Sequence, residues 1–476
     1  MDSWLKKDRE DMTEILRHTV NFAERYFAQQ ETLPPGRYIP DILMENLPAK
    51  GMGALDTLAF FQKNYADKIT NSAGPRYFGF VTGGSTPASV AGDWLVSAYD
   101  QNACGSNDSI APQIEQQTIH FFKQLFGLPQ EFYGSFVTGA TMSNFVGLAL
   151  GRQWVGEFHG KDVSSEGCHF PLKVISANPH SSTLKSLSML GIGRNALVKI
   201  ETLANREAID INSLEKYLQQ HSEPVIVVAN AGTVNTGDFD DLLAISELKK
   251  KYNFWMHVDA AFGGFAACSE KYDYLTKGID AADSVTVDAH KWLNVPYDAA
   301  MQFTRHKDLQ LKVFQNSAAY LGDPLKNPDF FHYTPENSRR WRALPSWFSL
   351  MAYGKTGHQE IIERNCSLAK QFGEMISREP EFILLNEVKL NMVCFTLKHP
   401  DLTSEIIQEF LRAVRDDKQV FFTPTRYKGI PAVRAAVSNW QTKPKDILMA
   451  YEAIKKVYQQ LFPKVKGRPI AGHKSF

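Results

Sequence analysis

Short β-branched runs, separated by helical patterns, recur through the middle of the chain and limit the folds that it can adopt. These runs predict strands at residues 172–176, 196–200, 224–230, 254–258 and 284–287. In the third run the apolar residues are consecutive instead of alternating, which is typical of a strand buried on both faces. Strands and helices in this order predict an α/β fold with a largely parallel sheet covered on both sides.

The chain divides into three stretches, and its 476 residues are enough for more than one domain. Residues 1–85 carry two amphipathic helical patterns but too few apolar positions for their own core, so we expect them to clasp a second subunit or to lie on their own large domain. Residues 86–350 hold the strand and helix rhythm. A long helical pattern at 346–376 leads into residues 351–476, which we expect to form a smaller α+β domain.

Composition excludes several classes of partner. The 52 Lys and Arg residues balance the 52 Asp and Glu residues, so no overall positive field favours a nucleic acid. The longest aliphatic runs are far shorter than the ~20 residues that cross a bilayer, and residues 1–20 lack the apolar core of a secretory signal. We therefore expect a cytoplasmic protein without a membrane span. The five scattered cysteines show no zinc spacing, so no metal site is expected.

Polar residues follow four of the predicted strands. They are His180, the turn at 230–233, Asp259, and the pair His290 and Lys291. Ligands of an open parallel sheet bind at the carboxyl ends of its strands, so this convergence predicts a functional site. Each member also has an ordinary structural explanation: His180 as a turn residue, Asp259 as a helix cap, and Lys291 as a lysine that extends to solvent.

A further candidate is the segment 135–144, which passes from a small-residue turn at Gly139 and Ala140 into a helical pattern. Free N–H groups and the helix dipole make such a start a phosphate site, although it could equally be an ordinary strand-to-helix turn. A phosphate site, an isolated Asp and a strand-end Lys match the needs of pyridoxal phosphate. The lysine forms the Schiff base, and the aspartate keeps the pyridine nitrogen protonated.

Three motifs carry a family resemblance. They are Pro179-His180-Ser181-Ser182, His257-Val258-Asp259-Ala260-Ala261, and the run 283–292 with Asp288-Ala289-His290-Lys291-Trp292. In combination they resemble the pyridoxal-phosphate group II decarboxylases, the family of aromatic-amino-acid and glutamate decarboxylases. The resemblance extends from about Tyr77 to about Leu461. It implies the fold-type I pyridoxal-phosphate transferase fold and a homodimer.

The resemblance also implies roles for individual residues. Lys291 would form the Schiff base, Asp259 would pair with the pyridinium, and His180 would stack on the cofactor ring. The remaining cofactor contacts it implies are Ala140 and Thr141 at the phosphate, Ala261 on the ring's other face, and His290. The chain departs from the family at Met142, where a Glu is common, and at Asp288, where many members have Asn. We do not assign Asp288 as a ligand, because an acid beside a phosphate is unfavourable.

The resemblance places catalytic and substrate residues in two further segments. The long loop at 315–338 resembles the mobile catalytic loop, with Tyr320 as the proton donor to the substrate carbanion, although Tyr320 could instead anchor a surface loop. Phe78, Phe80 and Thr82 resemble the patch that lines the substrate side chain. The segment 107–112 resembles one contributed across a dimer interface.

The sequence thus predicts a decarboxylase that converts an L-amino acid into an amine and carbon dioxide. Alternatives are an aminotransferase of the same fold, a decarboxylation-dependent aldehyde synthase, for which Tyr320 is the wrong residue, and a non-catalytic relative. The aromatic patch favours an aromatic or large side chain on the substrate. Arg76, Arg339 and Arg340 leave an acidic side chain possible.

Overall fold

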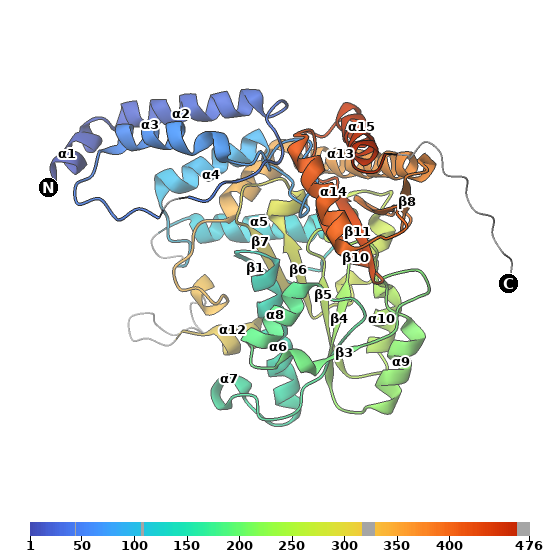
Figure 1. The fold of residues 1–476 in the computed structure, drawn as a ribbon. Coiled ribbons are helices and arrows are strands. Elements are labelled where there is room, and N and C mark those ends of the chain that lie inside the picture. Colours follow the sequence, from blue (N-terminus) through green and yellow to red (C-terminus); the bar gives the residue numbers. More distant parts are fainter. Residues whose placement is uncertain (43, 106–108, 317–328, 464–476) are drawn as a thin grey trace, which may run out of the picture.

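We describe a computed structural model of the chain, which covers residues 1–42, 44–105, 109–316 and 329–463. A large domain with a seven-stranded sheet and a smaller domain with a four-stranded sheet form the body of the molecule (Figure 1). Three N-terminal helices extend along one side of it.

The large sheet has the strand order β1-β7-β6-β5-β4-β2-β3. Its strands are β1 (Tyr133–Val137), β2 (Val174–Ser176), β3 (Leu197–Lys199), β4 (Val225–Asn230), β5 (Phe254–Asp259), β6 (Ser284–Asp288) and β7 (Ala300–Thr304). All pairs are parallel except the two that involve β7. The predicted α/β fold with a mostly parallel sheet is confirmed. The antiparallel β7 and its neighbour β1 are additions that the strand rhythm did not reveal.

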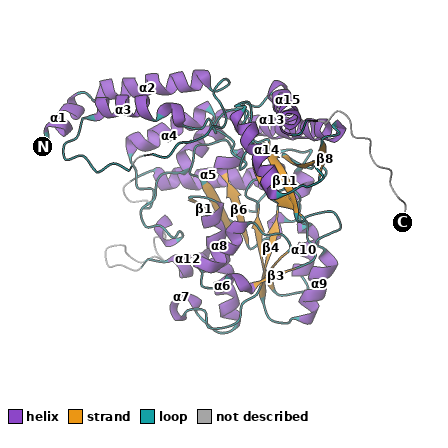
Figure 2. Cartoon of the chain, viewed as in Figure 1, coloured by secondary structure: helices purple, strands orange, loops and turns teal. Residues whose placement is uncertain are grey.

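Helices cover both faces of this sheet (Figure 2). The helices of the large domain are α4 (Pro87–Tyr99), α5 (Ala111–Phe126), α6 (Ala140–Phe158), α7 (Val163–Glu166), α8 (Ser181–Met189), α9 (Ile211–Gln220), α10 (Leu242–Lys249), α11 (Ala289–Trp292) and α12 (Lys307–Phe314). Strand β4 shows why its residues are apolar in succession. Val225 and Val227 pack into one hydrophobic cluster, while Ile226 and Val228 pack into another with Leu148 of α6. Both faces of the strand are therefore buried.

The small domain is an antiparallel sheet with helices packed on it. Its strands follow the order β10-β11-β9-β8 and are β8 (Phe382–Leu384), β9 (Met392–Leu397), β10 (Thr423–Tyr427) and β11 (Ile430–Ala436). Its helices are the C-terminal part of α13 (Ala343–Arg378), α14 (Ser404–Asp416) and α15 (Pro444–Leu461). The boundary predicted at residues 350 and 351 falls inside α13. Leu344 of this helix joins the core of the large domain, and Phe372 joins the core of the small one.

The N-terminal segment contains α1 (Ser3–Glu10), α2 (Met12–Gln29) and α3 (Ala54–Asn64). None of the residues described in these three helices is buried. The segment is tied to the body by polar contacts, such as the ion pair between Glu31 and Lys443 of the small domain at 2.8 Å. Among the described residues, no helix combines the length and the apolar character needed to cross a bilayer.

Candidate active site

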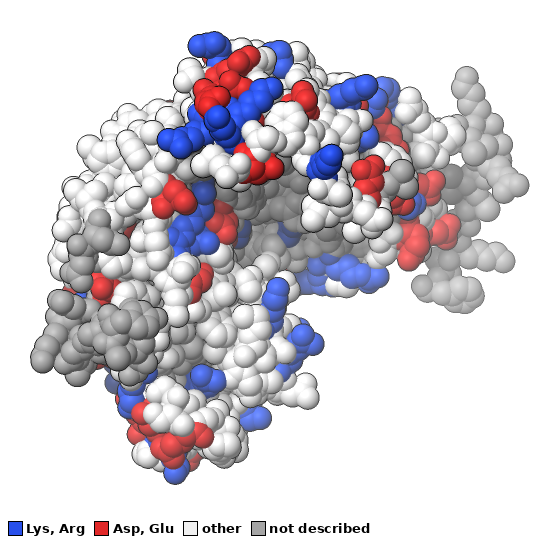
Figure 3. All heavy atoms as spheres, turned by 90° about the vertical axis from the view of Figure 1, so that its left-hand side faces the viewer, with Lys and Arg blue, Asp and Glu red and all other residues white. Residues whose placement is uncertain are grey.

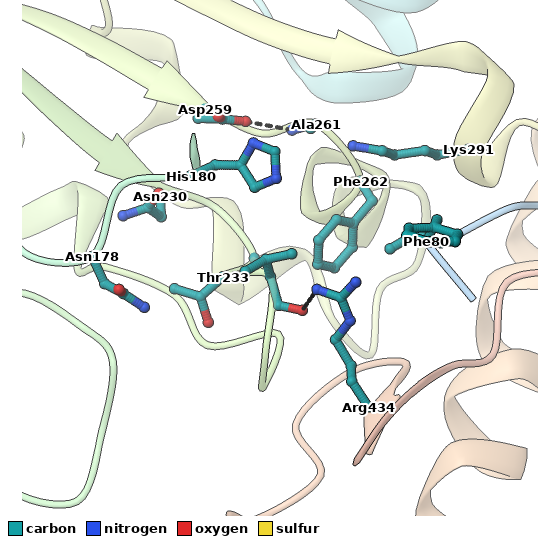
Figure 4. Close-up of a pocket in the computed structure, with 13 residues that line it drawn as sticks. Phe80, Asn178, His180, Asn230, Thr233, Asp259, Ala261, Phe262, Lys291 and Arg434 are labelled. Atoms are coloured by element: carbon teal, nitrogen blue, oxygen red, sulfur yellow. Dashed lines mark hydrogen bonds between the residues drawn. The ribbon is translucent and has the colours of Figure 1, made fainter. Parts of the chain in front are cut away.

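A cavity lies at the carboxyl ends of the parallel strands, beside the small domain (Figure 4). Residues at the end of four strands, or just after it, line the cavity. They are Asn178 and His180 after β2, Asn230 at the end of β4 and Thr233 after it, Asp259 at the end of β5 and Ala261 after it, and Lys291 after β6. The four strand ends that carry polar residues in the sequence therefore meet at one place. Arg434 of β11 contributes to the lining from the small domain.

Asp259 is the last residue of β5 and is 6% exposed. Its Oδ2 accepts a hydrogen bond from Nδ2 of Asn144 at 2.9 Å, and its Oδ1 accepts one from the Ala261 N–H at 3.2 Å. An ionised carboxylate only accepts hydrogen bonds, so donors on both oxygens fit Asp259 in its charged form.

Lys291 lies in the single turn of α11, and its Nζ is 2.7 Å from Oδ2 of the buried Asp288. The other oxygen of Asp288 is buried without a hydrogen-bond donor among the described residues. Asp288 thus forms an ion pair with the amino group of Lys291 in this structure. The chain before α4 passes close to this turn, because a Cβ at Gly83 would lie 1.8 Å from the Lys291 carbonyl oxygen.

His180 occupies the N-cap of α8 and points toward the cavity (Figure 4). Its Nδ1 is 2.7 Å from the Ser182 hydroxyl and accepts the Ser182 N–H at 3.2 Å. Desolvation lowers the pKa of His180 from its ordinary value, against the opposing field of Asp259. The imidazole is therefore neutral at neutral pH, with its proton on Nε2, since Nδ1 already accepts.

The predicted phosphate contacts Ala140 and Thr141 form the first turn of α6, and no side chain caps this helix. The turn lies beside the predicted cofactor residue His290, because a Cβ at Gly139 would be 3.6 Å from Cε1 of that ring. Burial lowers the pKa of His290, and its Nδ1 accepts the Ala299 N–H at 3.2 Å. Uncapped N–H groups and the helix dipole make this turn suitable for an anion.

The segment at 78–82 reaches the cavity only in part. Phe80 and Val81 line it, and both hold left-handed backbone conformations with φ of 55° and 60°, a strain that is common at functional sites. Thr82 is buried next to them, with its hydroxyl 3.3 Å from that of Tyr297. Phe78, which we predicted to contact the substrate, lies in the core of the small domain instead. Its backbone pairs with Phe421 and Ala436, which directs the ring inward.

Sequence reasoning missed several lining residues, and Arg434 and Phe262 are two of them. Arg434 is 9% exposed, donates to the Val234 carbonyl at 3.2 Å, and has a pKa that burial lowers. The signal for Arg434 was its place inside an apolar strand pattern, where a charged residue needs a reason. Phe262 directly follows the Asp259 motif, but nothing in its own pattern distinguishes it from a core aromatic.

The arginines that left an acidic substrate possible are engaged elsewhere. Arg339 forms a buried ion pair with Glu115 at 2.8 Å, and Arg340 pairs with Asp93 at 2.7 Å. Arg76 donates to the carbonyls of Gln419 and Glu31. The structure places none of these three arginines in the lining of the described cavity.

Two predicted segments fall partly outside the described residues. Tyr320, the predicted proton donor, lies there, as does Asn107 of the predicted interface segment.

The donors and acceptors around the cavity fit pyridoxal phosphate. Lys291 supplies an amine for its aldehyde, Asp259 a buried carboxylate for its pyridine nitrogen, and His180 a flat ring for stacking. The uncapped start of α6 supplies N–H groups for its phosphate.

Comparisons with known proteins agree with this chemistry. Residues 38–398 match the family model described as "Pyridoxal-dependent decarboxylase conserved domain". The chain is 28% identical to an aromatic-L-amino-acid decarboxylase of Bacillus atrophaeus, over 88% of each protein. It is 30% identical to the corresponding Drosophila lebanonensis enzyme, over 59% of this chain and 69% of that protein. Its fold resembles Oryza sativa TDC, solved with PLP and tryptamine, with a TM-score of 0.86 at 21% identity, over 95% of this chain and 98% of the other.

Proposed function

Because this chain belongs to the pyridoxal-dependent decarboxylase family and is a PLP-dependent carboxy-lyase acting on an amino acid, we propose that its substrate is an aromatic L-amino acid. The observation that carries the proposal is the lining of the cavity, where Phe80, Phe262 and Val81 stand near Lys291 and Arg434. The relatives named above act on aromatic amino acids, which supports the same choice.

The apolar part of the lining suits a large flat side chain. Phe80 is 58% exposed even though it lines the cavity, so its ring is available to pack against a ligand. Within the described part of the chain, the cationic groups of the lining are Lys291 and Arg434. Lys291 is needed to bind the cofactor. The guanidinium of Arg434 therefore remains for the α-carboxylate, which every amino acid has.

When bound, pyridoxal phosphate provides an electron sink next to the α-carbon of the amino acid. The residues of this chain would hold it. Asp259 would accept from the protonated pyridine nitrogen, and His180 would stack its ring, with the proton on Nε2, against the cofactor.

Arg434 is proposed to bind the α-carboxylate of the substrate. The replacement Arg434→Gln removes the charge, so we expect KM to rise by roughly 10- to 100-fold, the usual value of a hydrogen bond to a charged group. Steady-state kinetics with the best substrate check this. Arg426→Gln, at an exposed position of β10, serves as the matched control. A KM for Arg434→Gln equal to that of the control would remove Arg434 from substrate binding.

The substrate class is tested with the purified protein, pyridoxal phosphate and a panel of L-amino acids. We expect carbon dioxide and the matching amine from tryptophan, tyrosine or phenylalanine, with kcat/KM at least roughly tenfold above that for glutamate. A preference for glutamate would refute the aromatic assignment. Aldehyde and peroxide in place of amine would identify an aldehyde synthase instead.

We also propose that the protein is a homodimer joined in part by the N-terminal helices. Leu16 and Met12 of α2 are 57% and 53% exposed, and Val20 and Phe27 continue the same apolar stripe. Ile15, Phe22 and Tyr26 occupy a different face of α2 and are partly covered, so the exposed stripe is free for a partner. Viewed from this side, the molecule is hollowed beneath the N-terminal helices, and basic and acidic side chains gather along the top of the view (Figure 3). A second copy of this chain, with the same stripe, would cover the apolar stripe of α2 and the hollow beneath it.

The double replacement of Met12 and Leu16 by lysine is expected to convert the dimer into a monomer, because it places two charges in the apolar contact. Light scattering after size-exclusion chromatography measures the mass. Glu14→Lys, on another face of α2, is the matched control and should remain dimeric. A parent protein that is an active monomer would contradict the proposal.

A further inference from the structure

Asn144 of α6 is fully buried behind the cavity and makes three side-chain hydrogen bonds. Its Nδ2 donates to Asp259 Oδ2 at 2.9 Å and to Ser182 Oγ at 3.0 Å, and its Oδ1 lies 2.8 Å from Nε2 of His257. One amide therefore contacts Asp259 directly and reaches His180 through Ser182.

These bonds continue into a chain of defined direction. His257 Nδ1 is 2.7 Å from the Ser284 hydroxyl, which accepts the indole N–H of Trp255 at 3.0 Å. Nδ2 of Asn144 donates to Asp259, so Oδ1 of Asn144 faces His257 and can only accept. Nε2 of His257 must therefore donate to it. A neutral ring with its proton on Nε2 accepts at Nδ1, so the Ser284 hydroxyl donates there while it accepts from the indole.

His257 can donate from Nε2 and accept at Nδ1 because its ring is neutral. The ring is completely buried, and burial lowers its pKa below the ordinary value, while Asp259 opposes this. Helix α6 packs tightly against the ring, since a Cβ at Gly147 would lie 2.6 Å from its Nδ1. The ring is therefore held in one orientation and one tautomer.

The branch through Ser182 has a defined direction as well. Ser182 Oγ accepts from Asn144, so its own proton is free to go to His180 Nδ1 at 2.7 Å. This bond keeps the His180 proton on Nε2, the nitrogen that remains for the cavity. The amide of Asn144 thus influences both Asp259 and His180, the two residues expected to contact the cofactor ring.

We propose that Asn144 is a positioning residue that presents Asp259 as an ionised acceptor and His180 as its Nε2-protonated form. The hydrogen-bond chain Trp255, Ser284 and His257 holds the amide in the required orientation. The inference rests on the proposed function only in placing pyridoxal phosphate in the cavity. It concerns how the site is held in one protonation form before any substrate arrives.

The first test is the tautomer of His257 in the full-length protein without added cofactor. Nitrogen-15 NMR of histidine-labelled protein should show His257 with a protonated Nε2 and a bare Nδ1 at neutral pH, its signal identified by loss in His257→Gln. A proton on Nδ1, or on both nitrogens, would overturn the chain. This measurement involves neither cofactor nor substrate. The predicted tautomer can therefore be refuted without refuting decarboxylation, and decarboxylation can be refuted without refuting the tautomer.

The second test is cofactor binding by Asn144→Leu, which has a similar size but no polar atoms. We expect the Kd for pyridoxal phosphate to rise by roughly 10- to 100-fold, as for loss of a hydrogen bond to a charged group. With nitrogen-15 in the cofactor ring, its signal should move from the protonated toward the unprotonated position. An unchanged Kd and an unchanged ring signal would refute the role of Asn144.

The matched control is Ser143→Ala in the same helix. Ser143 is also fully buried and donates to Thr286 Oγ1 at 2.8 Å and is 2.9 Å from the Met301 carbonyl, without contact to Asp259. For Ser143→Ala, the Kd for pyridoxal phosphate and the nitrogen-15 signal of the cofactor ring should match those of the parent. If both variants weaken binding equally, the effect is general destabilisation and the proposal fails. If Asn144→Leu does not fold, Asn144→Ser, which is too short to bridge the same groups, takes its place with the same expected loss.

Discussion

Replacement of Lys291 by alanine is expected to abolish decarboxylation, with a loss of roughly 10⁴- to 10⁶-fold, the scale seen when a covalent nucleophile is removed. The Lys291 amine lines the cavity and lies 2.7 Å from Asp288, in the turn that directly follows β6. A methyl group in its place cannot form a bond to the cofactor aldehyde. Amine release in a coupled assay measures the loss.

The control for this variant is Lys250→Ala, which removes a lysine that is 68% exposed and pairs with the neighbouring Glu247 of α10. Its activity should equal that of the parent. Borohydride reduction of the cofactor-loaded parent, followed by peptide mass spectrometry, should place the pyridoxyl label on Lys291 alone. A label on any other lysine would show that the attachment site has been assigned wrongly.

Replacement of Asp259 by asparagine is expected to lower kcat by roughly 10²- to 10³-fold, comparable with the loss of a preorganised electrostatic group. The asparagine keeps the size of the side chain but brings no charge to the pyridine nitrogen, so the electron sink is weakened. It also turns a donor toward either Asn144 Nδ2 or the Ala261 N–H, which both donate now. Cofactor affinity should therefore fall together with the rate.

Absorbance titration with pyridoxal phosphate and steady-state kinetics measure the two effects of the Asp259 change. Asp241→Asn is the control, since Asp241 caps α10 through the Ala244 N–H and does not line the cavity. Near-normal turnover of Asp259→Asn would exclude Asp259 as the partner of the ring nitrogen.

Much of the large domain could be predicted from local pattern alone. The runs at 224–230 and 254–258 became β4 and β5 with almost the same bounds, because a strand buried on both faces is apolar at every position. The polar residues after them were then expected at one edge, since parallel strands end together. The antiparallel β7 was missed because its partners, β1 and β6, are chosen by long-range pairing that no local pattern records.

Local sequence was enough to predict the strands of the parallel sheet, the residues at their ends and the motifs of the family, because these depend on near neighbours in the chain. Which side chains face the cavity was settled by the packing of the folded chain. It brought Arg434 to Lys291 from another domain, sent Phe78 into a separate core, and joined Asn144 to His257 and Asp259. These outcomes depend on how α6 and the small sheet pack against the large one, and packing arises from contacts between residues far apart in the chain.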